Sequence, residues 1–140
     1  MAVDFNDWLK RREEAYRRFV EDIEIGYVDR DIVDFVKLVF SKKRIFTSSS
    51  CSGRIVVVDA LYPWLREEAY ILFKKHSPIK PSEISGIVER KPLYRYWLVV
   101  SGPIIHFNLF SLEDVQRLLN VLRICGFKHS GVISISSSGI

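Results

Sequence analysis

Side chains that could do chemistry are concentrated in one short stretch in the first half of the chain. From Thr47 to Arg54 the sequence is Thr-Ser-Ser-Ser-Cys-Ser-Gly-Arg. Hydroxyls and backbone amides can surround a phosphate or a carboxylate, and the planar guanidinium of Arg54 suits two-point contact with either anion. Gly53 allows a close approach of the backbone. We therefore expect an anion-binding loop here, against the alternative of a hairpin turn whose hydroxyls bond to their own backbone.

Two histidines are candidates for proton transfer, because imidazole exchanges a proton near neutral pH. His76 follows Lys74 and Lys75, whereas His106 lies in an apolar stretch of strand-forming residues. A single histidine in a strand is more often a hydrogen-bonded residue of the core than a proton acceptor, and both roles stay open for His106.

Several other classes of site are excluded by spacing. The chain has no Gly-x-x-x-x-Gly-Lys-Ser/Thr motif for nucleotide phosphates, no Gly-x-Gly-x-x-Gly motif for dinucleotides and no Gly-x-Ser-x-Gly nucleophile elbow. Cys51 and Cys125 have no zinc-ligand spacing, so no metal site is expected. The sequence shows no signal peptide and no apolar run of membrane-spanning length, so we expect a cytoplasmic protein with reduced thiols.

The elements that position these residues follow from hydrophobic periodicity. Apolar residues at helical spacing predict a helix over residues 5–24, closed by Gly26, and a second helix that Asp29 can cap. Ser111 and Asp114 form a capping-box pattern ahead of a third helix, which ends before Gly126. A short helix is expected within residues 79–88. The predicted strands are Arg44–Phe46, Arg54–Ala60, Ala69–Lys75, Tyr94–Ser101, Ile104–Phe110 and Val132–Ser136.

This order of elements does not alternate as βαβ units, which favours an α+β fold. We expect a single domain over residues 1–140, with a mixed or largely antiparallel sheet packed by two N-terminal helices and one C-terminal helix. Ser136–Gly139 has no core-forming residues and is expected to be loose.

The charge of the chain permits a nucleic-acid partner without requiring one. The formal net charge is +4, and basic residues gather on the polar face of the first predicted helix and just ahead of the Ser-rich stretch. The alternative is a solvated face with mixed ion pairs. The candidate phosphate contacts are Lys10, Arg11, Arg17, Arg18, Lys42, Lys43 and Arg44.

The Thr47–Arg54 stretch resembles the hallmark of the archaeal and eukaryotic wybutosine-synthesising protein 3 family. Further blocks resemble that family in the same order along the chain. They are Gly26-Tyr27-Val28-Asp29, Lys75-His76-Ser77-Pro78-Ile79, Pro103-Ile104-Ile105-His106, the helix from Ser111 to Leu122, and residues Gly126 to Val132. Phe107 departs from the valine that commonly follows the family's histidine. The chain also stops soon after Gly131, so we expect it to lack a C-terminal extension.

The resemblance implies an activity that spacing alone does not. It implies S-adenosylmethionine-dependent methylation of a ring nitrogen in a wybutosine precursor, next to the anticodon of tRNA(Phe). It implies His76 and His106 as catalytic residues. The residues that it implies for the methyl donor are Ser49, Ser50, Cys51, Ser52, Arg54 and Ser130. A non-catalytic tRNA- or RNA-binding module is the alternative function.

Overall fold

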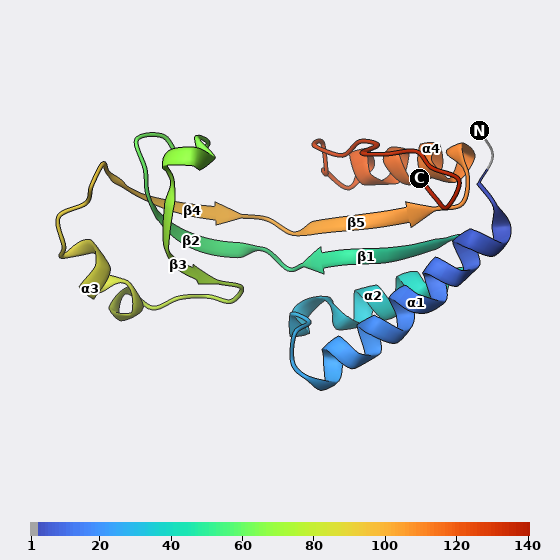
Figure 1. Cartoon of the computed structure of the whole chain (residues 1–140), viewed down its shortest axis with the longest axis horizontal. Coiled ribbons are helices and arrows are strands. Elements are labelled where there is room, and N and C mark those ends of the chain that lie inside the picture. The colour runs from blue at the N-terminus through green and yellow to red at the C-terminus, as the bar shows by residue number, and fades with distance from the viewer. Residues whose placement is uncertain (1–2) are drawn as a thin grey trace. The chain divides into compact units, whose positions relative to one another are not determined.

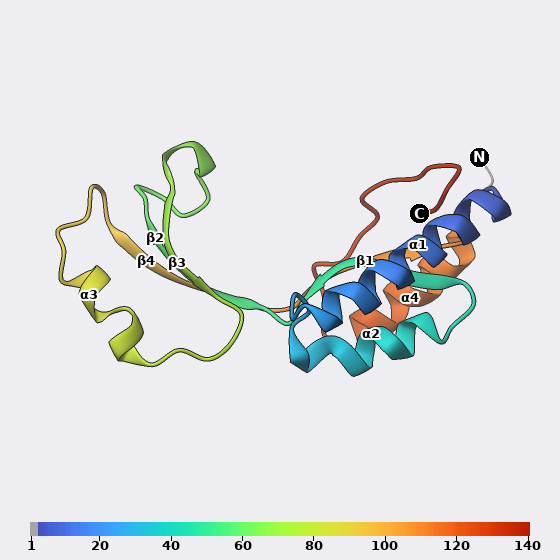
Figure 2. The same ribbon diagram turned by 60° about the horizontal axis from the view of Figure 1, so that its bottom comes forward.

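The computed structural model describes residues 3–140, and the chain divides into two compact units. Unit 1 holds the residues up to Ser50 and those from Ile105 onward, and unit 2 holds Cys51–Ile104. The chain therefore enters unit 2 once and leaves it once. Figures 1 and 2 show the helices and strands of each unit.

Two packed helices open unit 1. Helix α1 spans Phe5–Glu24 and begins where an Asp4 carboxylate oxygen accepts hydrogen bonds from the backbone amides of Asn6 and Asp7. Gly26 follows at φ +76°, a conformation that glycine adopts without a steric penalty. A 3₁₀ turn over Arg30–Ile32 leads into α2, which spans Val33–Phe40; the Asp29 side chain makes no capping hydrogen bond there.

Aromatic side chains hold these helices against the first strand of unit 1. The indole of Trp8 meets the ring of Phe46 edge-on, with centroids 5.5 Å apart, and Phe19 stacks on Phe40 at 5.6 Å. Burial of such large apolar surfaces is the dominant favourable term in folding. The buried residues of this cluster are Trp8, Phe19, Ile32, Val36, Phe40 and Phe46.

Strands β1 and β5 form a two-stranded sheet, and α4 follows β5. Strand β1 spans Ile45–Cys51, β5 spans Ile104–Leu109, and the arrows in Figure 1 run in opposite directions. Helix α4 spans Leu112–Ile124 and starts at Ser111, whose hydroxyl accepts a hydrogen bond from the Asp114 amide, as the capping pattern predicts.

The C-terminal residues differ from both expectations for them. Within the described chain, Val132–Ser136 forms no strand, because its backbone pairs only through an isolated bridge between Ser136 and Gly139. The predicted loose end is instead attached to unit 1: Ile140 and Leu109 exchange two backbone hydrogen bonds of 3.0 and 2.8 Å. Alternating apolar residues were a misleading signal here, since no partner strand lies beside them.

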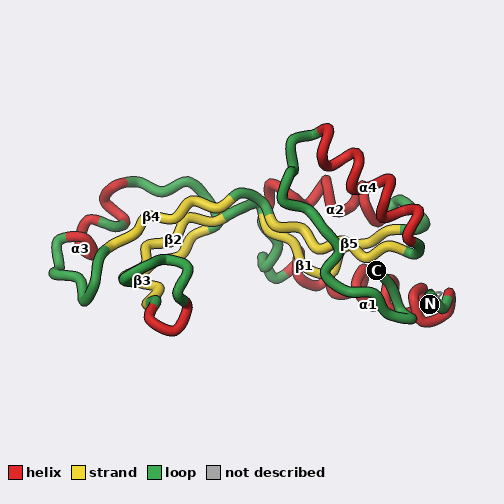
Figure 3. Tube along the Cα trace, turned by 90° about the horizontal axis from the view of Figure 1, so that it is seen from above, coloured by secondary structure: helices red, strands yellow, loops and turns green. Residues whose placement is uncertain are grey.

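Unit 2 is a three-stranded antiparallel sheet in the order β3-β2-β4, seen as adjacent yellow tubes in Figure 3. Its strands are β2 Arg54–Asp59, β3 Tyr70–Lys75 and β4 Tyr96–Ser101. The cluster buried on one face is Val56, Val58 and Ala60, with Ala69, Trp97 and Val99 packed on it. A 3₁₀ turn over Pro81–Glu83 and the short helix α3, Ser85–Val88, follow β3.

The α+β class is confirmed, together with antiparallel pairing, two helices ahead of the strands and one behind them. The strands form two sheets where one was expected, since β1 pairs with β5 and β2 pairs with β3 and β4. The assignment of residues 1–140 to one domain stays a prediction. Within residues 3–140, no helix is both long and apolar enough to cross a membrane.

Candidate functional site

The Ser-rich stretch is a strand over most of its length, so the expectation of a loop is wrong. Residues Thr47 to Cys51 continue β1, and Phe46 and Thr47 are buried whereas Ser48 and Ser49 are exposed. This strand pairs with β5 through its backbone, so its hydroxyls are not needed to stabilise a turn. The alternative of a hairpin is also wrong, because β1 and β2 lie in different sheets.

The break in the stretch falls at Gly53, in unit 2. Gly53 is buried at φ +123°, and a Cβ atom there would lie 2.7 Å from the carbonyl oxygen of Ser101. Only glycine tolerates this conformation and this approach. Arg54 follows directly as the first residue of β2, paired with Ser101 of β4. The glycine therefore fixes where the Arg54 side chain leaves the sheet.

Arg54 has an exposed side chain at this end of the sheet. Among residues 3–140, no ion pair or side-chain hydrogen bond holds its guanidinium. A guanidinium without a protein partner can bind a carboxylate or a phosphate in a bidentate contact, because no protein ion pair has to be broken first. It is thus the part of the predicted anion site that the geometry of unit 2 supports best.

Ser52 and His76 meet at the same end of unit 2. The Ser52 hydroxyl donates a hydrogen bond of 3.4 Å to the His76 carbonyl oxygen, and His76 follows Lys75, which pairs with Ile55 of β2. Cys51, a half-buried free thiol, precedes Ser52. The structure therefore brings the Cys51–Arg54 segment to the backbone of His76 within unit 2, and a shared site there stays a prediction.

Glu83 is a neighbour of this cluster that the sequence argument missed. Its carboxylate accepts a hydrogen bond of 2.6 Å from the Lys75 ammonium and one of 2.7 Å from the Lys80 amide. The hydrogen bond from Lys75, and then that from Lys80, hold the pKa of Glu83 below its ordinary value. Pro81 at the start of a short turn was the available signal for a capping carboxylate two residues later.

The other predicted site residues lie in unit 1. Ser49 is exposed, and the Ser50 hydroxyl oxygen is buried without a hydrogen-bond partner among the described residues. His106 is half-buried within β5. The Ser130 hydroxyl donates to the Phe127 carbonyl oxygen at 3.1 Å, a local contact after the end of α4. Unmatched buried hydroxyls are uncommon, so the Ser50 hydroxyl stands out in this set as a buried polar group without a partner among the described residues.

Several of the predicted phosphate contacts are used within unit 1. Arg17 and Arg18 form exposed pairs with Glu21 and Asp22 at 3.6 and 3.8 Å, and Arg11 donates to the Ser138 hydroxyl at 2.7 Å. Exposed i,i+4 pairs contribute about 0.3–0.5 kcal/mol each, so they yield readily to a phosphate. Lys10, Lys42 and Lys43 are exposed.

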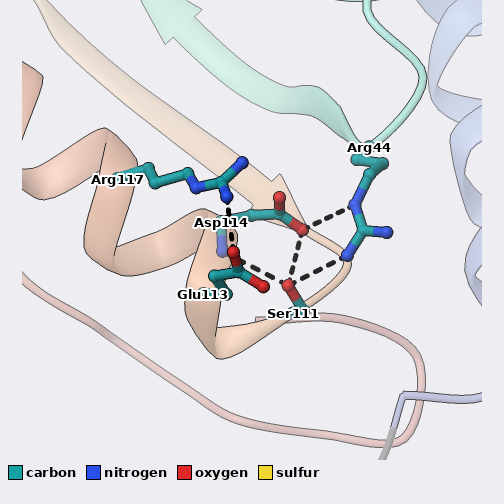
Figure 4. A network of polar contacts seen from close by, with 5 residues as sticks. All are labelled: Arg44, Ser111, Glu113, Asp114 and Arg117. Carbon is teal, nitrogen blue, oxygen red and sulfur yellow. Dashed lines mark hydrogen bonds and ion pairs between the residues drawn. The ribbon is translucent and has the colours of Figure 1, made fainter.

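Arg44 is held more firmly, in the network drawn in Figure 4. Its Nε donates to the Asp114 carboxylate at 2.9 Å, and its second amine donates to the Ser111 hydroxyl at 3.1 Å. Ser111 in turn donates to Asp114 at 2.6 Å. Burial alone would raise the pKa of Asp114, but the hydrogen bonds from Ser111 and Arg44 outweigh it and hold the pKa below its ordinary value. The charge of Arg44, a predicted phosphate contact, is thus neutralised by Asp114.

A groove of about 420 Å³ lies beside this network in unit 1. Its apolar lining comes from β1, β5 and α4, namely Ile45, Leu109, Leu118 and Val121. Its charged lining consists of Lys42, Lys43, Arg44, Asp114 and Arg117. The lining residues of α4 recur at i, i+3, i+4 and i+7, so one face of that helix forms the wall.

Sequence relatives cover almost all of this chain. A tRNA(Phe) 7-((3-amino-3-carboxypropyl)-4-demethylwyosine(37)-N(4))-methyltransferase of Saccharolobus solfataricus is 40% identical over 135 residues, which are 95% of this chain and 64% of the relative. The enzyme of the same name from Aeropyrum pernix is 37% identical over 117 residues, or 84% of this chain and 62% of the relative. The chain thus spans slightly less than two thirds of their length.

Solved structures and a family model agree with these relatives. The PH1069 protein from Pyrococcus horikoshii matches with a TM-score of 0.82 and 31% identity, covering 96% of this chain and 69% of that one. A hypothetical protein from Aeropyrum pernix matches with a TM-score of 0.70 and 35% identity over 79% of this chain and 64% of its own. The family model described as methyltransferase TYW3 matches residues 9–140. The chain belongs to the TYW3 methyltransferase family.

Proposed function

We propose that this chain methylates a ring nitrogen of a wybutosine precursor next to the anticodon of tRNA(Phe), with S-adenosylmethionine as the methyl donor. The observation that carries the proposal is the family match over residues 9–140. The relatives' name specifies N4 of a 4-demethylwyosine base at position 37 that carries a 3-amino-3-carboxypropyl group. This substrate has both a ring nitrogen to be methylated and a carboxylate to be held.

The residues of unit 2 fit the anionic end of such ligands. Arg54 is exposed and has no ion-pair partner within residues 3–140, and Gly53 fixes its departure from the sheet. It would hold the carboxylate of the donor or that of the substrate side chain. In unit 1, the buried Ser50 hydroxyl, which has no partner among the described residues, is a separate group whose hydrogen bond a ligand would satisfy.

When bound, S-adenosylmethionine supplies a methyl group on a positively charged sulfur, which is displaced as a neutral thioether. The protein then has to align the acceptor nitrogen with that methyl group, keep water out and take up the proton that the nitrogen loses. His76, beside the Ser52–Arg54 segment in unit 2, is the proposed proton acceptor in that unit, and His106 is the proposed acceptor in unit 1. Alignment and exclusion of water account for most of the rate in this proposal.

The basic residues would hold the tRNA backbone. Lys10, Lys42 and Lys43 are exposed, and Arg17 and Arg18 are bound only by weak surface pairs. Contacts of this kind make the affinity for tRNA fall as the salt concentration rises, because each neutralised phosphate releases counterions.

The first test is calorimetric titration of S-adenosylmethionine into the purified chain and into its Arg54→Ala variant. We expect micromolar binding that weakens at least tenfold in the variant, because one bidentate ion contact is lost. Arg90→Ala is the matched control: Arg90 lies in unit 2, is exposed and carries the same charge. It should leave the affinity unchanged.

The second test is transfer of a methyl group to tRNA(Phe) that carries the 4-demethyl precursor, followed by mass spectrometry of the digested nucleosides. A mass gain of one methylene in the modified base is the expected result. Tight tRNA binding without donor binding and without that mass gain would contradict the enzyme and favour the non-catalytic RNA-binding module.

A further inference from the structure

The groove in unit 1 combines a cationic rim with an aliphatic floor. The rim comes from Lys42 and Lys43, in the turn before β1, and from Arg117 on α4. The floor comes from Ile45 and Leu109 on the strand pair and from Leu118 and Val121 on α4. A ligand that satisfies both parts must carry negative charge and also a flat or apolar body.

The internal ion pair of the groove leaves the rim with a net positive charge. Arg44 and Asp114 neutralise each other at 2.9 Å, and Ser111 completes their hydrogen bonding, as Figure 4 shows. Within residues 3–140, no ion pair holds Lys42 or Lys43. Once the pair of Arg44 and Asp114 is set aside, the groove has three further cations, which are Lys42, Lys43 and Arg117.

Arg117 is available despite its neighbour Glu113. The two form an i,i+4 pair, but their side chains are 74% and 69% exposed. A pair so exposed is screened by water and salt and stabilises the helix by less than about 1 kcal/mol. An incoming phosphate can replace the Glu113 carboxylate at little cost, because an arginine contact with phosphate is charge-assisted and bidentate.

The floor is exposed enough to contact a ligand. Val121 is 54% exposed, and Ile45 and Leu118 are half-buried. Between cations, such a surface suits the face of a nucleobase or a ribose better than it suits an inorganic anion, which would leave the aliphatic side chains in water. The size of the groove, about 420 Å³, lies within the range of small-ligand sites.

We propose that this groove holds one unpaired nucleotide of an RNA strand, with its phosphate against Lys42, Lys43 and Arg117 and its base or ribose over Leu118 and Val121. The inference rests on the proposed function for its source of RNA, and it assigns a contact outside the Ser49–Arg54 segment. Arg44 and Asp114 act as positioning residues, because they hold the turn before β1 to the first turn of α4.

The test measures binding of a tRNA(Phe) transcript and of a labelled single-stranded RNA oligonucleotide over a series of salt concentrations. In the Lys43→Ala/Arg117→Ala variant, we expect affinity at low salt to fall about tenfold or more. The slope of log affinity against log salt should fall by about 0.7, since one single-strand phosphate contact is lost. Val121→Ser should weaken binding a few-fold and leave that slope unchanged.

Arg123→Ala is the matched control, since Arg123 is an exposed arginine of the same helix outside the groove. An equal loss in that control, or an unchanged salt slope in the double variant, would overturn the proposal. A third result would also overturn the proposal. If Val121→Ser weakened binding of a polyglutamate peptide as much as it weakened binding of RNA, the groove would bind an acidic peptide.

Calorimetry with S-adenosylmethionine on the same variants separates this proposal from the proposed function. Donor binding should be unchanged in the Lys43→Ala/Arg117→Ala variant, because none of the residues expected to hold the donor lines the groove. Normal RNA binding by that variant, alongside methyl transfer by the parent chain, would overturn the groove alone. Absence of methyl transfer with the expected RNA results would overturn the proposed activity and leave the groove standing.

Discussion

The absence of a side chain at Gly53 determines the geometry of the proposed anion site. At Gly53 the backbone approaches Ser101 so closely that one added carbon would meet its carbonyl oxygen at 2.7 Å. From the sequence alone, Gly53 allows a close approach of the backbone or a positive φ, and the structure shows both. The close approach occurs between neighbouring strands rather than around a ligand.

Gly53→Ala should destabilise unit 2 by about 1–3 kcal/mol, because alanine is strained at φ +123° and its methyl group collides with backbone. Urea unfolding followed by circular dichroism measures the loss. Gly86→Ala is the control, since nothing lies within 4 Å of its Cβ position in α3. That change should be neutral or stabilise by up to about 1 kcal/mol, and an equal loss in both variants would contradict this account.

Asp114 should make the stability of unit 1 sensitive to acid. Its pKa in the folded chain lies below the ordinary value of 3.8, so its ionised form stabilises the fold at higher pH. That contribution is lost as the pH falls below about 4 and through the lowered pKa of the folded state. Asp114→Asn should therefore show a smaller drop in urea midpoint between pH 7 and pH 3 than the parent chain.

Glu113→Gln is the control for the acid experiment, because its exposed side chain lies next to Asp114 on the same helix. It should keep the acid sensitivity of the parent chain. If Asp114→Asn kept that sensitivity as well, the ion pair with Arg44 would not be the cause.

At the scale of elements, the sequence predicted best where a local signal fixes a boundary. Helix α1 has the predicted bounds, 5–24, and α4 starts at its capping serine. The failures are at Thr47–Cys51 and at residues 132–136. Serines carry no strand preference of their own, so only pairing with β5 makes the first segment a strand. The second has a strand-like pattern and no partner.

The same limit applies to the candidate site. Arg54, Ser52 and His76 could be named as candidates because sequence motifs contain them, and in the structure the Ser52 hydroxyl contacts the His76 backbone within unit 2. Their roles stay predictions. Glu83 and the groove at Arg117 could not be named in this way, because they depend on which chain segments fold against one another.

The end of the chain acts as part of unit 1, and Gly139 is what permits it. Gly139 is buried at φ +145°, and its Cβ position is 3.4 Å from Cδ1 of Trp8. Gly139→Ala should release this segment and accelerate hydrogen exchange at the Leu109 amide, which donates to Ile140. Gly131→Ala, with open space at its Cβ position, should leave that amide protected. Equal protection in both variants would contradict the proposed docking.

At the scale of the whole molecule, each unit has its own core. The cluster around Trp8 and Phe46 belongs to unit 1, and the one around Val56 and Val58 belongs to unit 2. Separate cores can open as separate cooperative units.

Val57→Ala should remove about 2 kcal/mol of stability from unit 2, since Val57 is 2% exposed at the centre of its sheet. Native-state hydrogen exchange should show faster exchange in β2, β3 and β4, with α1 and α2 nearly unchanged. A uniform loss of protection over the whole chain would show instead that the molecule unfolds as one unit.

The division of unit 1 into two chain segments has a consequence for synthesis on the ribosome. Unit 2 is contiguous, and the pairing of Arg54 with Ser101 closes its two ends on each other, so it can fold as soon as it has emerged. The helices α1 and α2 emerge before unit 2, yet they must wait for β5 and α4, which belong to the later segment of unit 1. Vectorial synthesis therefore exposes the aromatic face of α1 for longest, and chaperones that bind nascent chains would find their target there.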